Sequence, residues 1–226
     1  EGKILTQAAP MSSPIDKQIT SIAVISETEF LVGYGTGKIK VWSSITREAS
    51  KTFEAHEKGH SVLGIRIHKS NTSDPVFYTF SSNEREVKIW KLKDFSLIEK
   101  LESRDFPKKI DLISEMNHLI VEYYNELILF DLLSKNKIMV LPQSTYYIGN
   151  FNSSIYLFGK GNEQAFIYDA VFRDTKEVDF IIDKCIFAKI GKSTILRQNK
   201  GYKRPCEIFE FNVEKLNFNL IASPKL

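Results

Sequence analysis

The stretch FEAHEKGHSV, from Phe53 to Val62, contains the residue types of a hydrolytic zinc site. Its centre fits the pattern H-E-x-x-H, with His56, Glu57 and His60. On a helix, two histidines at this spacing lie one turn apart and can ligate one Zn²⁺, while the glutamate acts as a general base. The chemistry therefore requires a helix over these residues.

Two features argue against that site. The surrounding run TREASKTFEAHEK is rich in helix formers, but Gly59 is typical of a helix C-terminus, which would leave His60 outside the helix. The extended pattern also needs Gly where Leu63 stands and His where Arg66 stands, and Glu84 falls in a predicted turn rather than on a second helix. We therefore expect no metal site and no cofactor.

Other chemical motifs are incomplete. GYGTGK and IGKS would be phosphate-binding loops only with a glycine where Val32 and Ile186 stand, so both are interpreted as turns. No Ser-His-Asp or Cys-His arrangement is indicated by spacing, and Cys185 and Cys206 are expected to be small core residues rather than nucleophiles. The sequence predicts no catalytic residues and a protein that is not an enzyme.

The composition indicates a folded intracellular protein. The 226 residues are 42% hydrophobic and 12% aromatic, enough for a sizeable core, and the net charge of +3 does not predict nucleic-acid binding. Two cysteines in a chain of this length favour a reducing compartment, cytoplasmic or nuclear. We find no signal peptide and expect no integral membrane segment. Because the chain starts with Glu1 rather than Met, we expect a fragment or a processed product.

A repeat of about 40 residues organises the chain. Five segments combine alternating apolar residues with an aromatic residue: KIKVWS, EVKIWK, LILFDL, AFIYDA and EIFEFN. Their aromatic residues are Trp42, Trp90, Phe130, Tyr168 and Phe209, at spacings of 48, 40, 38 and 41 residues. This step is the length of one four-stranded propeller blade.

Each repeat contains enough predicted strands for one blade. Runs rich in Ile, Val, Phe and Tyr alternate in polarity and are interrupted by Gly, Asn, Ser and Pro, which gives roughly twenty strands in five groups of four. We predict an all-β chain, a β-propeller of four-stranded antiparallel blades with about five blades visible. We place it in a single domain, 1–226, with blades at 18–56, 61–103, 107–143, 145–183 and 185–223, and with residues 1–10 as the outer strand of a preceding blade.

The second group resembles a WD repeat of the β-propeller superfamily. Ala55-His56 stands where that family has Gly-His, and Trp90-Lys91 stands where it has Trp-Asp. Glu84 occupies the tight-turn position that usually holds Asp, with Ser82 nearby. The resemblance implies a blade-locking hydrogen-bond network of His56, Ser82, Glu84 and Trp90, and a structural role for Trp42 in the first group.

The family resemblance also bears on the number of blades. Family members mostly have seven blades, and open sheet edges need to be covered. We therefore expect this chain to be part of a larger, seven-bladed propeller, with a compact five-bladed ring as the alternative.

Two basic clusters are candidate binding sites. The first lies in RQNKGYKRPC and consists of Arg197, Lys200, Tyr202, Lys203 and Arg204. The second surrounds Phe106 and consists of Arg104, Lys108 and Lys109. Basic loops that carry an aromatic residue can hold an acidic peptide, a phosphate group or an RNA strand. Ordinary solvated surface charge is the alternative interpretation.

The predicted function is a non-catalytic protein–protein interaction scaffold, a WD-repeat-like subunit whose partners are other proteins of a stable complex. One alternative is phosphoinositide or nucleic-acid contact through the basic loops, although the Phe-Arg-Arg-Gly motif of phosphoinositide-binding propellers is absent from the sequence. Another alternative is a substrate receptor of a ubiquitin ligase, which would normally carry an adaptor-binding region.

Overall fold

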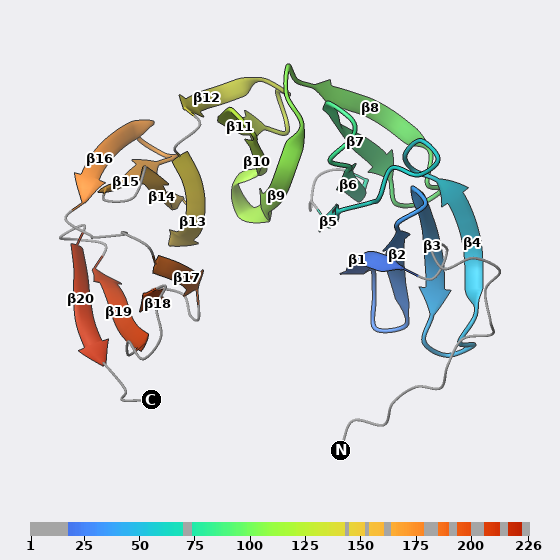
Figure 1. Cartoon of the computed structure of the whole chain (residues 1–226), viewed down its shortest axis with the longest axis horizontal. Coiled ribbons are helices and arrows are strands. Elements are labelled where there is room, and N and C mark those ends of the chain that lie inside the picture. Colours follow the sequence, from blue (N-terminus) through green and yellow to red (C-terminus); the bar gives the residue numbers. More distant parts are fainter. Residues whose placement is uncertain are drawn as a thin grey trace. The chain divides into compact units, whose positions relative to one another are not determined.

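The computed structural model describes residues 18–69, 74–142, 145–151, 154–160, 164–178, 185–189, 194–199, 206–212 and 217–222. These residues form twenty strands in five four-stranded sheets, and the strands of each sheet follow chain order, so that consecutive strands pair (Figure 1). The chain divides into two compact units, Glu1–Ile110 and Asp111–Leu226.

The first unit contains two sheets. The first consists of β1 (Ile19–Val24), β2 (Glu29–Tyr34), β3 (Lys38–Ser43) and β4 (Ala49–Glu54). The second consists of β5 (Gly64–His68), β6 (Val76–Phe80), β7 (Glu86–Lys91) and β8 (Leu97–Glu102).

These two sheets pack face to face through side chains that alternate along their strands. Leu31 and Val41 of the first sheet belong to one buried cluster with Ile65, Phe77 and Trp90 of the second. Removing such side chains from water contributes roughly 2 kcal/mol each, so this cluster stabilises the packing of the two sheets.

The second unit contains three sheets. The third sheet consists of β9 (Pro107–Ile113), which spans the boundary between the units, β10 (His118–Tyr123), β11 (Glu126–Asp131) and β12 (Lys137–Pro142), with the 3-10 turn η2 (Ser114–Met116) before β10. The fourth consists of β13 (Thr145–Phe151), β14 (Ile155–Lys160), β15 (Gln164–Asp169) and β16 (Asp174–Val178). The fifth consists of β17 (Cys185–Lys189), β18 (Thr194–Asn199), β19 (Cys206–Asn212) and β20 (Asn217–Ala222).

Two apolar clusters hold these sheets together. Ile120 and Leu129 of the third sheet pack in one cluster with Tyr156 of the fourth. A second cluster joins the fourth and fifth sheets, where the rings of Phe151 and Phe211 lie 4.5 Å apart. The fourth sheet thus uses one face for each of these two neighbours, as the alternating sequence pattern requires.

The turns between the third and fourth strands share one design in the first, third and fourth sheets. The residue that ends the third strand uses a side-chain oxygen to accept hydrogen bonds from the backbone N–H groups two and three residues further along the chain. These residues are Ser43, Asp131 and Asp169. A basic residue with positive φ then leads into the next strand: Arg47, Lys135 and Arg173. Asp and Ser favour such turns because their side chains replace a backbone acceptor.

The all-β prediction with four-stranded antiparallel sheets is confirmed. The helix that the zinc pattern required is not formed, because β4 ends at Glu54 and His56 to His60 lie in the connection to β5. The described residues contain no helix long and apolar enough to cross a lipid bilayer. The predicted strand at residues 1–10 lies outside the described residues, and the single-domain organisation stays a prediction.

Candidate functional site

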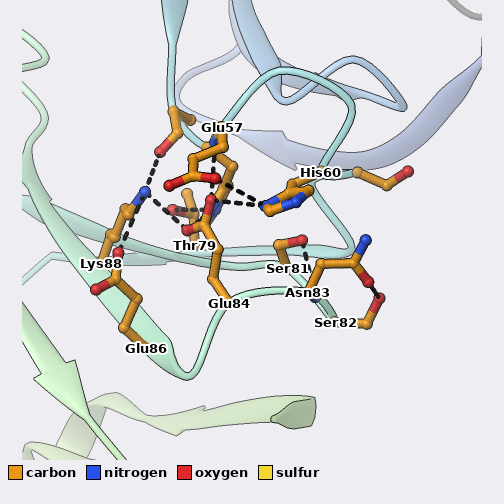
Figure 2. Close-up of polar contacts among 12 residues, drawn as sticks. Glu57, His60, Thr79, Ser81, Ser82, Asn83, Glu84, Glu86 and Lys88 are labelled. Atoms are coloured by element: carbon orange, nitrogen blue, oxygen red, sulfur yellow. Dashed lines mark hydrogen bonds and ion pairs between the residues drawn. The ribbon is translucent and has the colours of Figure 1, made fainter.

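Glu84 is the centre of a polar network in the turn between β6 and β7. Its Oε2 lies 2.6 Å from His56 Nδ1 and 2.8 Å from Lys88 Nζ. Its Oε1 accepts the backbone N–H of Glu57 at 2.8 Å and lies 3.3 Å from His60 Nδ1 (Figure 2). Both carboxylate oxygens are therefore saturated with donors.

The network continues into the sheet through Thr79 on β6. The indole Nε1–H of Trp90 donates to Thr79 Oγ1 at 2.9 Å, and the same hydroxyl lies 3.1 Å from His56 Nε2. The hydroxyl accepts from Trp90, which leaves its own hydrogen to donate to His56 Nε2. His56 is then neutral, with its proton on Nδ1 and directed at Glu84. We call His56, Thr79, Glu84, Lys88 and Trp90 the His56–Glu84 network.

Backbone contacts hold His56 in its position within this network. The amides of Ala55 and His56 both donate to the carbonyl of Gly37, at 3.0 Å each, in the turn between β2 and β3. Gly37 has a φ of 89°, and a Cβ there would lie 2.6 Å from the Glu57 carbonyl oxygen. Only glycine fits this close approach, so the β4–β5 connection is fixed to the first sheet by its backbone and to the second by Glu84.

Lys88 supplies the positive charge of the network from a buried position. Its side chain comes from β7, and its Nζ donates to the Ala55 carbonyl at 3.0 Å and pairs with Glu86 at 3.3 Å as well as with Glu84. Glu86 in turn pairs with the more exposed Lys100 at 2.9 Å. A buried lysine needs such partners, because an unpaired charge inside a protein is strongly unfavourable.

The pKa values follow from these contacts. Burial pushes the pKa of Glu84 upward, but the hydrogen bonds from Lys88, His56 and the Glu57 amide outweigh it and lower that pKa to about 2. Burial lowers the pKa of His56 below its usual value, against the opposing effect of Glu84. At neutral pH the network therefore holds an ionised glutamate and a neutral histidine.

This geometry suits structural locking rather than catalysis. Both ring nitrogens of His56 are engaged inside the protein, so neither is available to a metal ion. Glu84 has a pKa too low for an effective base at neutral pH. Across the residues with described side chains, no group of three His, Cys, Asp or Glu is arranged to hold a metal ion.

The structure brings together three of the four residues expected in the lock: His56, Glu84 and Trp90. Ser82 is different, because it lies in the turn and its hydroxyl donates to Asn83 Oδ1 at 3.1 Å. Thr79, which points from β6 between His56 and Trp90, holds the place expected for Ser82. The expectation failed because Ser82 lies beyond the end of β6 and its hydroxyl donates within the turn, whereas Thr79 lies on the strand between His56 and Trp90.

Trp42, the counterpart of Trp90 in the first sheet, has another partner. Its indole Nε1–H donates to the hydroxyl of Tyr34 at 3.2 Å. This bond stays within the first sheet.

The second basic cluster is divided by the strand that carries it. Arg104 is exposed in the turn before β9, and Lys108 and Lys109 are successive strand residues, so their side chains point to opposite faces of the sheet. The ring of Phe106 packs under Arg85, at 5.0 Å, in a cation–π contact. A binding role for these residues stays a prediction, and a single shared basic surface is not formed by them.

The first basic cluster lies largely beyond the described residues. Arg197 belongs to β18, where its backbone pairs with Phe187 and Glu207. The other predicted residues, Lys200, Tyr202, Lys203 and Arg204, fall outside the described part of the chain.

The burial of His118 was not anticipated from the sequence. His118 Nδ1, at the start of β10, lies 2.6 Å from the hydroxyl of Tyr156 on β14, with the rings edge to face. The pair joins the third and fourth sheets. Its sequence signal is weak, because 38 residues separate the two side chains and no motif marks Tyr156.

Comparison with known proteins supports the fold. A computationally designed protein, Ika8, matches with a TM-score of 0.66 and 14% identity over 92% of this chain and 62% of its own. The β-propeller domain of Myceliophteria thermophila Cps50 (Swd1) matches with a TM-score of 0.67 and 12% identity over 92% of this chain and 73% of that domain. The chain is a β-propeller. At these identities the likeness shows the fold alone.

The propeller also resembles a chain in the mitotic checkpoint complex, with a TM-score of 0.62 and 13% identity over 88% of this chain and 63% of that one. It thus spans less than two thirds of the designed protein and of the checkpoint-complex chain. No protein-family model and no curated protein sequence matches it.

Proposed function

We propose that this propeller is a non-catalytic protein–protein interaction scaffold, a WD-repeat-like subunit of an intracellular multiprotein complex. The observation that carries the proposal is the His56–Glu84 network. The histidine and the glutamate that would otherwise suggest hydrolysis are saturated by contacts that fix a connection between sheets. These residues make the connection rigid, and a docking platform requires a rigid scaffold.

The pattern of exposure supports the same function. The edge strands β4 and β16 expose most of their side chains. Their neighbours in the same sheets, β3 and β15, carry buried apolar side chains, among them Ile39, Val41 and Ile167. A stiff β scaffold with exposed edges and turns displays many side chains without a large ordering cost on binding. One of the structurally similar chains comes from a multiprotein assembly, the mitotic checkpoint complex.

Affinity purification tests this function. The tagged protein, expressed in its own source at its natural level, should elute from a sizing column together with a stoichiometric set of other proteins identified by mass spectrometry. A Lys203→Glu/Arg204→Glu variant separates the basic-loop alternative, since nucleic-acid or phosphoinositide contact would be lost with the charge and would weaken steeply with salt. Elution of the protein as a single free species would contradict the scaffold function.

A further inference from the structure

A pocket of about 250 Å³ lies between the third and fourth sheets, within the second unit. Leu141 and Pro142, at the end of β12, line it from the third sheet. Phe166 of β15 and Thr175 of the edge strand β16 line it from the fourth. Drug-sized ligands occupy sites of roughly 300 to 1,000 Å³, so the size of this pocket is better suited to one inserted side chain.

The corresponding place in the first unit is filled by the His56–Glu84 network. Phe166 precedes Tyr168 by two residues on the third strand of its sheet, just as Lys88 precedes Trp90. The position of the buried lysine is therefore taken by an aromatic ring in the second unit. The first unit closes this place with its own polar side chains, whereas the second unit keeps a pocket beside the ring.

A buried hydroxyl at this pocket has no partner among the described residues. Thr145, the first residue of β13, lines the pocket and is 7% exposed, and its Oγ1 makes no hydrogen bond there. A buried hydroxyl without a partner is unfavourable, because it has lost its hydrogen bonds to water. An occupant that carries a polar group at its tip would remove this penalty.

The apolar lining of the pocket favours an aromatic ring. Phe166 is half-buried, and its ring stacks on that of Phe158 at 5.2 Å with 20° between the planes. A ring that enters beside Phe166 extends this aromatic contact, and Leu141 and Pro142 add aliphatic surface. Tyrosine combines such a ring with a hydroxyl at its tip, and it is frequent among the residues that dominate binding at protein interfaces.

The rim of the pocket adds a negative charge. Glu177 of β16 pairs with Phe166 in the ladder, so the two side chains lie on the same face of the sheet. Glu177 is exposed, and the described part of the chain gives it no cationic partner. The neighbouring Lys176 also borders the pocket, but it pairs with Ile167 and its side chain lies on the opposite face. A lysine or arginine that follows the inserted residue can therefore pair with Glu177.

We propose that this pocket anchors a tyrosine side chain of a partner protein, with a lysine or arginine of the same segment beside Glu177. The ring lies against Phe166, and the phenol hydroxyl shares a hydrogen bond with Thr145. The inference rests on the proposed scaffold function, because it gives the chemistry of one segment that the scaffold binds.

Probe binding to the purified protein at its natural length tests the pocket. The probes are the N-acetyl amides of tyrosine, phenylalanine and tryptophan, and the NMR signals of the Leu141 and Thr145 methyl groups report occupancy. The tyrosine probe should bind about fivefold more tightly than the phenylalanine probe, because it adds one hydrogen bond. Equal or tighter binding of phenylalanine or tryptophan would overturn the choice of tyrosine. Unchanged methyl signals with all three probes would show that the pocket holds solvent only.

The Thr145→Val variant separates recognition from folding. Valine has a similar shape, and Thr145 has no hydrogen bond through Oγ1 to lose, so the Tm should stay the same or rise. The preference for tyrosine over phenylalanine should disappear in this variant and persist in Thr145→Ser, which keeps a hydroxyl. A preference that survives in Thr145→Val would contradict the assigned hydrogen bond.

Co-purification from the protein's own source connects the pocket to a partner. A Thr145→Val/Glu177→Lys variant should lose one member of the complex, whereas Glu48→Lys, at an exposed glutamate of the first unit, should lose none. A complete complex with the pocket variant would overturn this inference and leave the scaffold function standing. A wild-type protein that elutes alone would contradict the scaffold function, and the partner proposed here would fall with it, whatever the probes show.

Discussion

Two of the buried histidines show two ways of joining sheets. His56 in the first unit binds an ionised glutamate and a threonine, and through them a buried lysine and a tryptophan. His118 in the second unit binds the hydroxyl of Tyr156. The first arrangement is an extended charged network, and the second is a single contact without formal charge.

The difference lies in what each histidine needs when it is buried. Burial lowers the pKa of both histidines, so each is held neutral and each must satisfy a ring nitrogen inside the protein. The network satisfies both nitrogens of His56 but makes Glu84 and Lys88 depend on each other. We therefore expect the first unit to be more sensitive to loss of one member than the second.

The largest effect is expected from Glu84→Ala. It leaves the buried Nδ1–H of His56 without its acceptor and removes the nearer of the two carboxylates that pair with Lys88. This should lower the free energy of unfolding of the first unit by about 3 kcal/mol. Both tryptophans of the chain, Trp42 and Trp90, lie in the first unit, so urea unfolding followed by tryptophan fluorescence reports it directly. Glu54→Ala is the matched control, because it breaks an exposed pair with Lys38 and should change stability by less than about 0.5 kcal/mol. Equal effects of the two variants would mean that Glu84 does not stabilise the connection between the two sheets.

Thr79→Val should have the next largest effect. It removes the hydroxyl that serves both His56 and Trp90, so that two buried groups lose a partner, with a loss of about 2 kcal/mol. Thr79→Ser keeps the hydroxyl and should retain most of the stability in the same fluorescence assay. If Val and Ser were equally tolerated, the hydroxyl would have no part in the network.

Tyr156→Phe tests the His118–Tyr156 contact in the second unit. It leaves one nitrogen of His118 without its partner, and we expect a loss of about 1 kcal/mol. Hydrogen exchange of β10 and β14 should become faster, while tryptophan fluorescence of the first unit stays unchanged. Tyr124→Phe, at a half-exposed tyrosine of the same unit, is the control. A loss as large as that of Glu84→Ala would remove the proposed distinction.

The smallest effect is the dependence on pH near neutrality. Because the folded pKa of each histidine lies below its unfolded value, the unfolded chain binds protons first as pH falls through that value near 6.5. Each histidine should therefore remove about half a kcal/mol of stability between pH 7 and 6.

Further acidification distinguishes the units. The low pKa of Glu84 adds a stability term to the first unit that is present above pH 4.5 and is lost as pH falls from 4.5 toward 2. Hydrogen exchange across a pH series resolves the two units, and the Glu84→Gln variant should lack this second loss. An acid loss that persisted undiminished in the Glu84→Gln variant would contradict the assignment to Glu84.

The sequence indicated the His56–Glu84 network because its residues belong to a repeat. The period of about 40 residues indicated the blades, and the resemblance of the second group to a WD repeat implied that His56, Glu84 and Trp90 lie together. The sequence predicted Ser82 as the hydroxyl partner of His56, whereas the structure has Thr79 there. The exact residue at which β6 ends is decided by pairing with β7, which the sequence does not show. It gave no sign of the His118–Tyr156 pair, which depends on the packing of one sheet against the next.

By itself the sequence determined the all-β class, the forty-residue period and the failure of the zinc pattern, because alternation, turn residues and missing ligands are local properties. Only the tertiary structure decided which polar groups are buried together. Lys88 has the sequence signature of an ordinary exposed strand residue, yet it lies buried among Glu84, Glu86 and the Ala55 carbonyl. Lys40, at the corresponding position of the first sheet, is only half-buried and lies over the Tyr34 ring, because burial depends on what packs against a strand rather than on the strand itself.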